Sequence, residues 1–197
     1  MGYIIRLGII LMVVSGLGAG ALALVNLKTK PIIEDYKRVE EARARAEVME
    51  AGKKFVLCDS ASALPFYKVF ADEEGTQLIG YVFTAEGKGY SSTVKTVAGV
   101  DTAFNLVGIK VTSQQETPGL GAKCQEITYG EDDSWFQRQF FSGYYENRGE
   151  SPLNALTIAV DKDGGKIHSI TGATITGRAI ANSIKQAASE IKVRVEG

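Results

Sequence analysis

The sequence is poor in the residues from which many protein sites and scaffolds are built. Its 197 residues include one histidine, two cysteines and four prolines. Two cysteines cannot form the disulfide framework of a small secreted domain. A single histidine, His168, with two isolated cysteines argues against a zinc site, and a hydrolase triad would have to be built around the same histidine. What remains is a site made of carboxylates and hydroxyls, or one that binds an organic cofactor.

An excess of charge of either sign is also missing. Lysine and arginine number 22, aspartate and glutamate number 23, and the formal net charge is -1. This balance gives no electrostatic basis for binding nucleic acid. Hydrophobic residues at 45% and charged residues at 23% exclude a disordered chain. The length predicts one globular domain with an appendage.

The appendage is a run of nineteen uncharged residues from Leu7 to Val25. As a helix it would span roughly 28 Å, close to the ~30 Å hydrocarbon core of a bilayer. Membrane spans tolerate its glycines, and the stretch from Gly16 to Gly20 forms a small-residue face that favours packing against another helix. We predict a short tail at residues 1–6 and a transmembrane helix at residues 7–27.

A cleaved signal peptide is the competing interpretation, because Ala21-Leu22-Ala23 resembles a small-x-small cleavage site. The uncharged run is longer than the usual apolar region of about 7–15 residues, and Arg6 alone supplies N-terminal charge, so a retained anchor is favoured. Basic residues after the run would leave the domain in the cytoplasm by the positive-inside rule: Lys28, Lys30, Lys37 and Arg38. That rule is weak where a long domain follows, so charge leaves the orientation open.

The rest of the chain predicts an exposed helical stalk at residues 28–52 and one α+β domain at residues 53–197. Pro31 suits the first turn of the stalk helix and Gly52 suits its end. The domain is expected to contain an antiparallel sheet with flanking helices. Four β-rich segments with short glycine-containing turns predict its hairpins: Phe66–Phe70, Leu78–Thr84, Thr93–Val100 and Leu106–Thr112, with turns at residues 73–75 and 86–89.

Three further elements are expected after the sheet. Ser134–Phe141 predicts a short aromatic helix, and Ala155–Val160 with Lys166–Ile170 predicts a hairpin across Asp163-Gly164-Gly165. A final helix is expected from about Thr174. Its apolar residues recur at helical spacing on one face: Ile180, Ile184, Ala187, Ala188 and Ile191.

The first motif that suggests chemistry runs from Ser169 to Gly177, where a strand meets the last helix. Thr171 and Thr174 are able to cap the helix, and Gly172 permits a sharp turn, so an ordinary capped helix start is the simpler interpretation. The free N–H groups of a helix N-terminus also bind phosphate, and a hydroxyl placed there is a candidate for phosphate esterification. Because no Walker pattern accompanies the motif, a nucleotide triphosphatase is disfavoured.

The second motif runs from Gln115 to Lys123 and contains a turn at Pro118-Gly119. The simpler interpretation is an ordinary surface loop. Glycines on both sides of Leu120 would also let the backbone approach a flat ring closely. Lys123 would then place positive charge near a cofactor that becomes anionic on reduction.

Together these motifs carry a family resemblance. Thr171-Gly172-Ala173-Thr174 resembles the S/T-G-A-T flavinylation motif of FMN-binding domains, and Glu116-Thr117-Pro118-Gly119-Leu120-Gly121 resembles their ETPGLG loop. Gly89-Tyr90-Ser91-Ser92 resembles their G-Y-G-G segment, with serines in place of the later glycines. With a single N-terminal span, the whole chain resembles the G subunits (RnfG) of Rnf ion-translocating electron-transport complexes. The C subunits (NqrC) of sodium-pumping NADH:quinone reductases are a related alternative.

The resemblance implies covalent FMN, joined by a phosphoester to Thr174, with Thr176 as the rival hydroxyl. A separate flavin transferase installs the FMN part of FAD. The other residues expected to bind the cofactor are Thr171, Gly172, Ala173, Glu116, Thr117, Gly119, Leu120, Gly121, Lys123, Tyr90 and Ser91. The chain departs from the family at His168, where an aspartate is usual, and Asp163 lies too early to replace it. This departure leaves transferase recognition open, and we expect His168 to have a structural role near the phosphate.

A tethered flavin cannot leave between turnovers, so the resemblance implies a fixed electron relay without catalytic activity of its own. The implied partners are membrane subunits A, D and E of an Rnf-type complex, the flavin transferase and membrane lipid. Such a complex couples ferredoxin–NAD electron transfer to Na+ or H+ transport, and its flavin domain lies on the outer face of the cytoplasmic membrane. A non-redox, membrane-anchored binding module is the alternative from another class. A stand-alone flavin reductase is disfavoured, because no G-x-G-x-x-G fingerprint follows a strand.

The two cysteines receive a separate interpretation. Cys124 follows Lys123 directly, which permits a position near the ring, but an inert buried thiol is the favoured interpretation. A disulfide between Cys58 and Cys124 stays open if the domain is extracytoplasmic.

Overall fold

The computed structural model describes residues 2–58, 64–127 and 131–196. The chain divides into two compact units, and the boundary in the sequence lies between Glu40 and Glu41. The first unit consists of one helix, the N-terminal part of α1 (Gly2–Val48). Among the described residues, α1 is the one helix long and apolar enough to cross a membrane. Its large apolar side chains are exposed from Tyr3 to Val39.

The helix differs from the prediction in two respects. The predicted tail is already helical from Gly2 onward, and Pro31 lies inside α1 instead of opening a second helix. A proline inside a helix removes one backbone hydrogen bond. The alanine- and glutamate-rich sequence after Pro31 has high helix propensity, so the helix continues beyond the proline.

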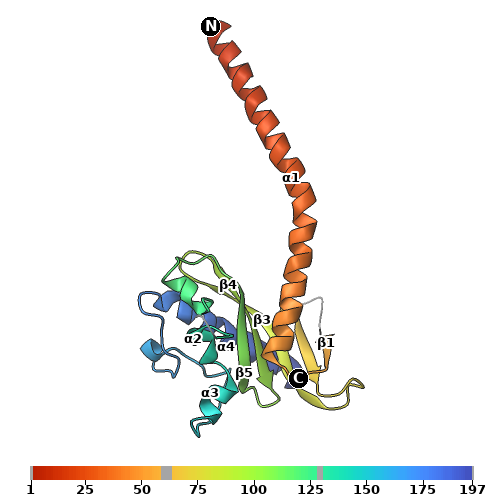
Figure 1. The fold of residues 1–197 in the computed structure, drawn as a ribbon, viewed down its shortest axis with the longest axis vertical. Coiled ribbons are helices and arrows are strands. Elements are labelled where there is room, and N and C mark those ends of the chain that lie inside the picture. The colour runs from red at the N-terminus through yellow and green to blue at the C-terminus, as the bar shows by residue number, and fades with distance from the viewer. Residues whose placement is uncertain (1, 59–63, 128–130, 197) are drawn as a thin grey trace. The chain divides into compact units, whose positions relative to one another are not determined.

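The second unit is built on a five-stranded antiparallel sheet whose strands follow one another in sequence order (Figure 1). The strands are β1 (Lys54–Cys58), β2 (Phe66–Phe70), β3 (Leu78–Lys88), β4 (Thr93–Asp101) and β5 (Leu106–Ser113). The predicted α+β class and the four predicted strands are confirmed. The predicted turn at residues 86–89 is wrong for its first three residues, because β3 pairs with β4 as far as Lys88. Strand β1 was not predicted, because its sequence, Lys-Phe-Val-Leu-Cys, does not alternate between polar and apolar residues.

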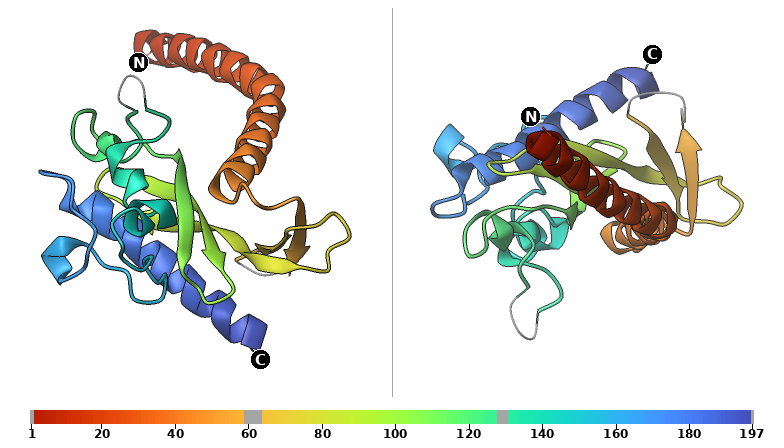
Figure 2. Two further views of the ribbon diagram at one scale, coloured as in Figure 1. Left: turned by 60° about the horizontal axis from the view of Figure 1, so that its bottom comes forward. Right: turned by 90° about the horizontal axis from the view of Figure 1, so that it is seen from above.

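One face of the sheet is covered by α4 (Thr174–Glu196), as Figure 2 shows. The start and the apolar face predicted for this helix are confirmed. Its buried residues pack with odd-numbered residues of β3, such as Phe83 and Ala85, in the larger hydrophobic core. The core therefore fixes the direction of α4 across the strands.

The other face of the sheet is covered by the last turns of α1. Ala44, Val48 and Met49 are buried against Val69 and Val82, together with Val97, in a second hydrophobic cluster. The prediction of an exposed stalk through residue 52 is therefore wrong for its last part. The few apolar residues at the end of the stretch are the ones that contact the sheet, and the second compact unit begins at Glu41.

The chain between β5 and α4 contains short helices and loops. The 3-10 helix η1 (Gly121–Cys124) comes first, then α2 (Trp135–Arg138) and α3 (Ser142–Glu146), and a second 3-10 helix, η2 (Asp161–Asp163). The predicted aromatic helix is present as the shorter α2, which Ser134 caps by accepting a hydrogen bond from the N–H of Gln137.

The hairpin predicted at residues 155–170 is wrong. Val160 and Ile167 form a single parallel bridge, and the N–H of Ala155 bonds to the carbonyl of Phe104. The backbone of this segment thus finds a partner in the β4–β5 turn. A Cβ at Gly165 would lie 1.9 Å from the carbonyl oxygen of Ala159, so the segment folds back tightly only because this residue is glycine.

A buried hydroxyl in the sheet gives a stability prediction. Thr96 of β4 is fully buried, and among the described residues its Oγ1 has no hydrogen-bond partner. Replacing Thr96 with the isosteric valine is expected to raise the free energy of unfolding by about 1 kcal/mol, because an unsatisfied buried hydroxyl is removed. Urea unfolding of the full chain in detergent, followed by the fluorescence of Trp135, measures the change.

Thr176→Val is the matched control for this prediction. Thr176 is equally buried, but its hydroxyl lies 2.7 Å from a carboxylate oxygen of Glu116. The control is expected to lower the free energy of unfolding by about 1–2 kcal/mol, because a charged partner loses its donor. Equal effects from the two substitutions would contradict the prediction.

Candidate functional site

Three segments that are distant in sequence form a cavity of about 340 Å3 at one end of the sheet. They are the β3–β4 turn, the loop after β5 and the start of α4. The cavity falls within the usual size range of ligand sites, about 300–1,000 Å3. The lining residues are Tyr90, Thr117, Leu120, Gly121, Gly172, Ala173 and Ile175. Six of these seven are predicted site residues, so the structure brings both motifs and the turn into one site.

The walls of this cavity expose large apolar side chains. Tyr90, Leu120 and Ile175 are 75%, 43% and 50% exposed. Clustered apolar exposure of this kind marks a surface that a ligand or partner covers. Sequence reasoning missed Ile175. An isoleucine in the first turn of the last helix, outside its predicted apolar face, is a pattern that points to a ligand-facing residue.

Two glycines, Gly172 in the cavity lining and Gly119 in the loop after β5, lie at the turns predicted for them. Gly119 and Gly172 have φ values of +72° and +78°, which other residues rarely adopt. A Cβ at Gly172 would also lie 3.0 Å from a methyl group of Leu120. The turn before α4 and the loop after β5 are therefore in direct contact across the cavity.

The carboxylate of Glu116 lies behind this cavity and joins its three segments. Its Oε1 accepts hydrogen bonds from the N–H groups of Ser91 and Ser92 at 3.0 and 2.9 Å and from the Ser92 hydroxyl at 3.1 Å. Its Oε2 accepts from the N–H of Tyr90 at 3.1 Å and from the hydroxyl of Thr176 at 2.7 Å. Glu116 does not line the cavity, and it holds the residues that do.

Glu116 is ionised despite its burial. Burial opposes the charged form, but the hydrogen bonds from Thr176, Ser92, Ser91 and Tyr90 outweigh it, so the pKa of the carboxyl lies below its ordinary value. Since the folded-state pKa is depressed, this carboxylate stabilises the folded protein above the ordinary glutamate pKa. That contribution is lost as the pH falls through the folded-state pKa.

The two candidate attachment hydroxyls have different environments. Thr174 is the first residue of α4 and is partly exposed, whereas Thr176 is fully buried and donates its hydroxyl proton to Glu116. The N–H of Gly177 bonds to the carbonyl of Ala173. Helix geometry leaves the N–H groups of the first turn without intrahelical partners, and such groups attract anions.

The remaining predicted residues lie outside the cavity wall. The side chains of Ser91, Thr171 and Lys123 are exposed, and none of them lines the cavity. Ser91 contributes its backbone N–H to Glu116. Lys123 lies on η1, one residue before the buried Cys124.

The loop after β5 is held in place by residues that sequence reasoning missed. The side chain of Gln137 accepts a hydrogen bond from the N–H of Val111 at 2.6 Å, and Gln125 donates to the Val111 carbonyl at 3.0 Å. The hydroxyl of Ser134 donates to the carbonyl of Cys124 at 2.7 Å. These polar residues satisfy the free edge of β5 and fix η1 against it. Polar residues within the predicted aromatic helix, Ser134 and Gln137, are the signal in the sequence that points to them.

His168 lies beside an aspartate that the linear sequence does not place there. Its Nδ1 is 3.8 Å from Oδ2 of Asp161, and its side chain is 68% exposed. The N–H of the next residue, Ser169, donates to Asp161 at 3.2 Å, and the Ser169 hydroxyl does so as well. These hydrogen bonds, the hydroxyl one first, hold the pKa of Asp161 below its usual range. Asp163, the other aspartate, is paired with Arg178 of α4 at 2.8 Å.

Both cysteines are free thiols in the structure. Cys124 is fully buried, and burial together with the nearby charge of Glu116 raises its pKa to about 12. We expect a maleimide reagent at neutral pH to label the partly exposed Cys58 much faster than Cys124, because only an accessible thiolate reacts. Mass spectrometry of labelled peptides measures the two rates, and the unfolded chain serves as the control in which both react. Equal labelling of the native protein would contradict the buried position of Cys124.

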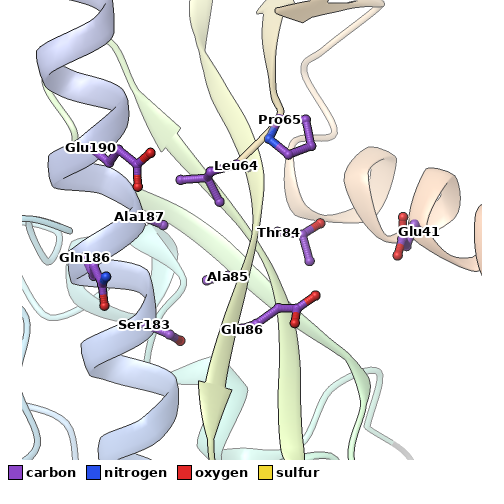
Figure 3. Close-up of a pocket in the computed structure, with 10 residues that line it drawn as sticks. All are labelled: Glu41, Leu64, Pro65, Thr84, Ala85, Glu86, Ser183, Gln186, Ala187 and Glu190. Carbon is purple, nitrogen blue, oxygen red and sulfur yellow. The ribbon is translucent and has the colours of Figure 1, made fainter. Parts of the chain in front are cut away.

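A larger cavity, of about 430 Å3, lies between α4 and β3 (Figure 3). Glu41, Glu86 and Glu190 line it, together with Ser183 and Thr84 among other residues. Two of its three carboxylates are paired with basic side chains, Glu86 with Lys95 and Glu190 with Arg194, and its lining residues do not include the start of a helix. The smaller cavity, with apolar walls next to a helix N-terminus, is therefore the better site for an anionic, flat ligand.

Comparison with known proteins identifies the family of the chain. Residues 89–189 match the FMN-binding domain, and the matched segment contains all seven residues of the smaller cavity. The chain belongs to the FMN-binding domain family. FMN is thus confirmed as its cofactor class.

Relatives of this FMN-binding protein cover most of its length. The G subunit of the ion-translocating oxidoreductase complex of Cronobacter sakazakii is 30% identical over 189 residues, which cover 91% of this chain and 86% of the relative. The G subunit of the Na(+)-translocating ferredoxin:NAD(+) oxidoreductase complex of Acetobacterium woodii is 29% identical over 197 residues, which cover 92% and 88%. The resemblance to these G subunits is confirmed, and it fits membrane association of the chain through α1.

Among solved structures, the chain is similar to the C subunit of the Na(+)-translocating NADH-quinone reductase from Parabacteroides distasonis. The TM-score is 0.42 and the sequence identity 24%, with 64% of this chain and 59% of that chain covered.

Proposed function

We propose that this chain is a membrane-anchored electron-transfer subunit that carries FMN covalently bound to Thr174. One observation carries the choice of residue. Thr174 begins α4 with a partly exposed side chain beside the cavity residue Ala173, whereas the rival hydroxyl of Thr176 is buried and bonded to Glu116. The acceptor must reach a second protein, the transferase, so accessibility favours Thr174.

The residues present fit FMN in its two chemically different parts. The N-terminus of α4 offers unpaired N–H groups and the positive end of the helix dipole to the phosphate. Tyr90, Leu120 and Ile175 offer apolar surface to the ring, and Gly121 and Gly172 allow close approach of the backbone. When bound, FMN supplies the capacity to accept and donate electrons one or two at a time.

The attachment requires a balanced transfer. The Oγ of Thr174 forms a bond to the phosphorus of the FMN half of FAD, the hydroxyl proton is lost, and AMP departs when the pyrophosphate bond breaks. A flavin transferase supplies the catalysis. Asp161 beside His168 and Ser169 provides a carboxylate close to the motif, in the region where the family usually has one in the linear sequence.

The proposed setting is an Rnf-type complex. Relatives are named as the G subunits of ion-translocating and ferredoxin:NAD(+) oxidoreductase complexes, and we propose the same assembly here, with membrane subunits A, D and E as neighbours. Residues 7–27 of α1 would cross the cytoplasmic membrane once in contact with lipid, and residues 53–197 would form the flavin domain on its outer face. The span carries no charge, so this protein would contribute a redox centre and no ion pathway.

The test is the intact mass of the denatured full chain after co-expression with a flavin transferase. A mass increase equal to phosphoester-linked FMN, with flavin fluorescence that persists after denaturation, is the expected result. A protein without flavin of any kind would contradict the proposal and favour a non-redox binding module. Flavin that is lost on denaturation would retain the electron-transfer function and exclude the phosphoester.

A further inference from the structure

The most heavily bonded side chain near the cavity belongs to Glu116, which the proposed attachment and electron transfer leave without a task. Five donors surround its carboxylate, three of them backbone N–H groups of one turn, residues 90–92. The residue is 6% exposed. An ordinary loop needs no buried charge for its closure, so this arrangement calls for a functional reason.

Two glycines are adapted to the same carboxylate. A Cβ at Gly89 would lie 2.7 Å from Oε1 of Glu116, and a Cβ at Gly121 would lie 2.8 Å from Oε2 and from the hydroxyl of Thr176. Neither glycine has a positive φ, so backbone conformation does not require them. The space that the Glu116 carboxylate occupies requires glycine at both positions.

Within the part of the chain that the structure describes, the partners of the Glu116 carboxylate do not include a basic side chain. Among residues 2–58, 64–127 and 131–196, the ion pairs do not include this carboxylate. Its five partners are neutral dipoles. The N–H of the cavity residue Tyr90 bonds to the Glu116 carboxylate, and a Cβ at Gly121, another cavity residue, would contact the same carboxylate. A net negative charge therefore lies directly behind the wall of the flavin site.

We propose that Glu116 is a positioning residue for the flavin site, which fastens the Tyr90 wall to α4 and makes the bound flavin harder to reduce through its unpaired negative charge. This inference rests on the proposed function. Buried charges are weakly screened, so a fixed anion disfavours the addition of electrons to a neighbouring group. Charge near the ring is one of the means by which a protein sets the potential of a flavin.

Three variants separate the charge from the fastening. Glu116→Gln removes the charge and keeps the size of the side chain. Glu116→Asp keeps the charge and shortens its reach. Thr176→Val keeps the Glu116 charge and removes one of its hydrogen bonds.

The first measurement uses the full chain without flavin, expressed in the absence of a transferase. Amide hydrogen exchange of residues 90–92 is expected to accelerate by more than about tenfold in Glu116→Gln. The NH2 group that replaces one carboxylate oxygen cannot accept a hydrogen bond, and the remaining oxygen is a weaker, neutral acceptor. Thr176→Val is expected to accelerate it less, since four donors keep their acceptor. Unchanged exchange in Glu116→Gln would overturn the fastening role.

The second measurement is the midpoint potential of the flavin-loaded full chain by spectroelectrochemistry. Glu116→Gln is expected to shift it to more positive values, while Glu116→Asp and Thr176→Val stay near the wild type. A shift of the same size in all three variants would assign the effect to loosening of the loop and overturn the charge role, as would no shift in Glu116→Gln. The wild type controls for the proposed function: if it carries no flavin, that function fails, and the exchange measurement still tests Glu116.

Discussion

Replacing Thr174 with alanine is expected to abolish covalent FMN completely. The structure shows one accessible threonine hydroxyl at the first residue of α4, and its alanine variant has no oxygen to form the phosphoester. The neighbouring hydroxyl of Thr176 cannot substitute without leaving Glu116, from which it is separated by 2.7 Å in a fully buried position. The intact mass of the denatured chain after co-expression with a flavin transferase measures the loss.

Thr174→Ser and Thr176→Val are the controls for this result. Serine keeps the hydroxyl at the same residue, so we expect it to retain the adduct. Thr176→Val keeps Thr174, so we expect it to retain the adduct. Its free energy of unfolding is expected to be lower, because the hydrogen bond to Glu116 is lost. An adduct that survives Thr174→Ala and disappears in Thr176→Val would move the attachment to Thr176 and reverse the assignment made from burial.

Gly87→Ala is expected to have the largest effect on stability among substitutions near the site. Gly87 lies in β3 on the face that α4 covers, and its Cβ would lie 2.3 Å from the carbonyl oxygen and 2.7 Å from the carbonyl carbon of Ala179. Backbone atoms of a packed helix cannot move aside cheaply, so α4 would have to shift away from the sheet. We expect the free energy of unfolding to fall by about 3 kcal/mol.

The same shift would displace the start of α4 from the loop that contains Leu120. Flavin occupancy is therefore expected to fall together with stability, and both are measurable on one preparation by absorbance and urea unfolding. Gly143→Ala in α3 is the control, because a Cβ there meets no atom within 4 Å. A Gly87→Ala protein as stable as the wild type would show that α4 is not held at this distance from β3.

The predictions that succeeded rest on patterns among near neighbours in the chain. Alternating and β-rich segments located four of the five strands, and helical spacing located the buried face of α4, including Ile180 and Ile191. The turns at Gly119 and Gly172 were predicted from the motifs themselves, and both glycines have a positive φ. The motifs themselves identified the family and its cofactor, because their residues are contiguous.

The predictions that failed concern segments whose partners are distant in sequence. The end of the predicted stalk is buried because Val48 and Met49 meet Val69 and Val82 of the sheet. The predicted hairpin at residues 155–170 gave way to hydrogen bonds with the β4–β5 turn. In both cases the local pattern was compatible with the prediction, and a long-range contact decided the outcome.

By itself, the sequence determined the class of fold, the length and apolar character of the N-terminal helix, the family and FMN, because each depends on composition or on residues close together in the chain. Only the tertiary structure decided how the site is assembled. It placed the carboxylate of Glu116 against a hydroxyl 60 positions away, which distinguishes Thr176 from Thr174, and it brought Asp161 beside His168. Burial and hydrogen bonding between distant segments follow from the packing of the whole chain, and no local pattern contains them.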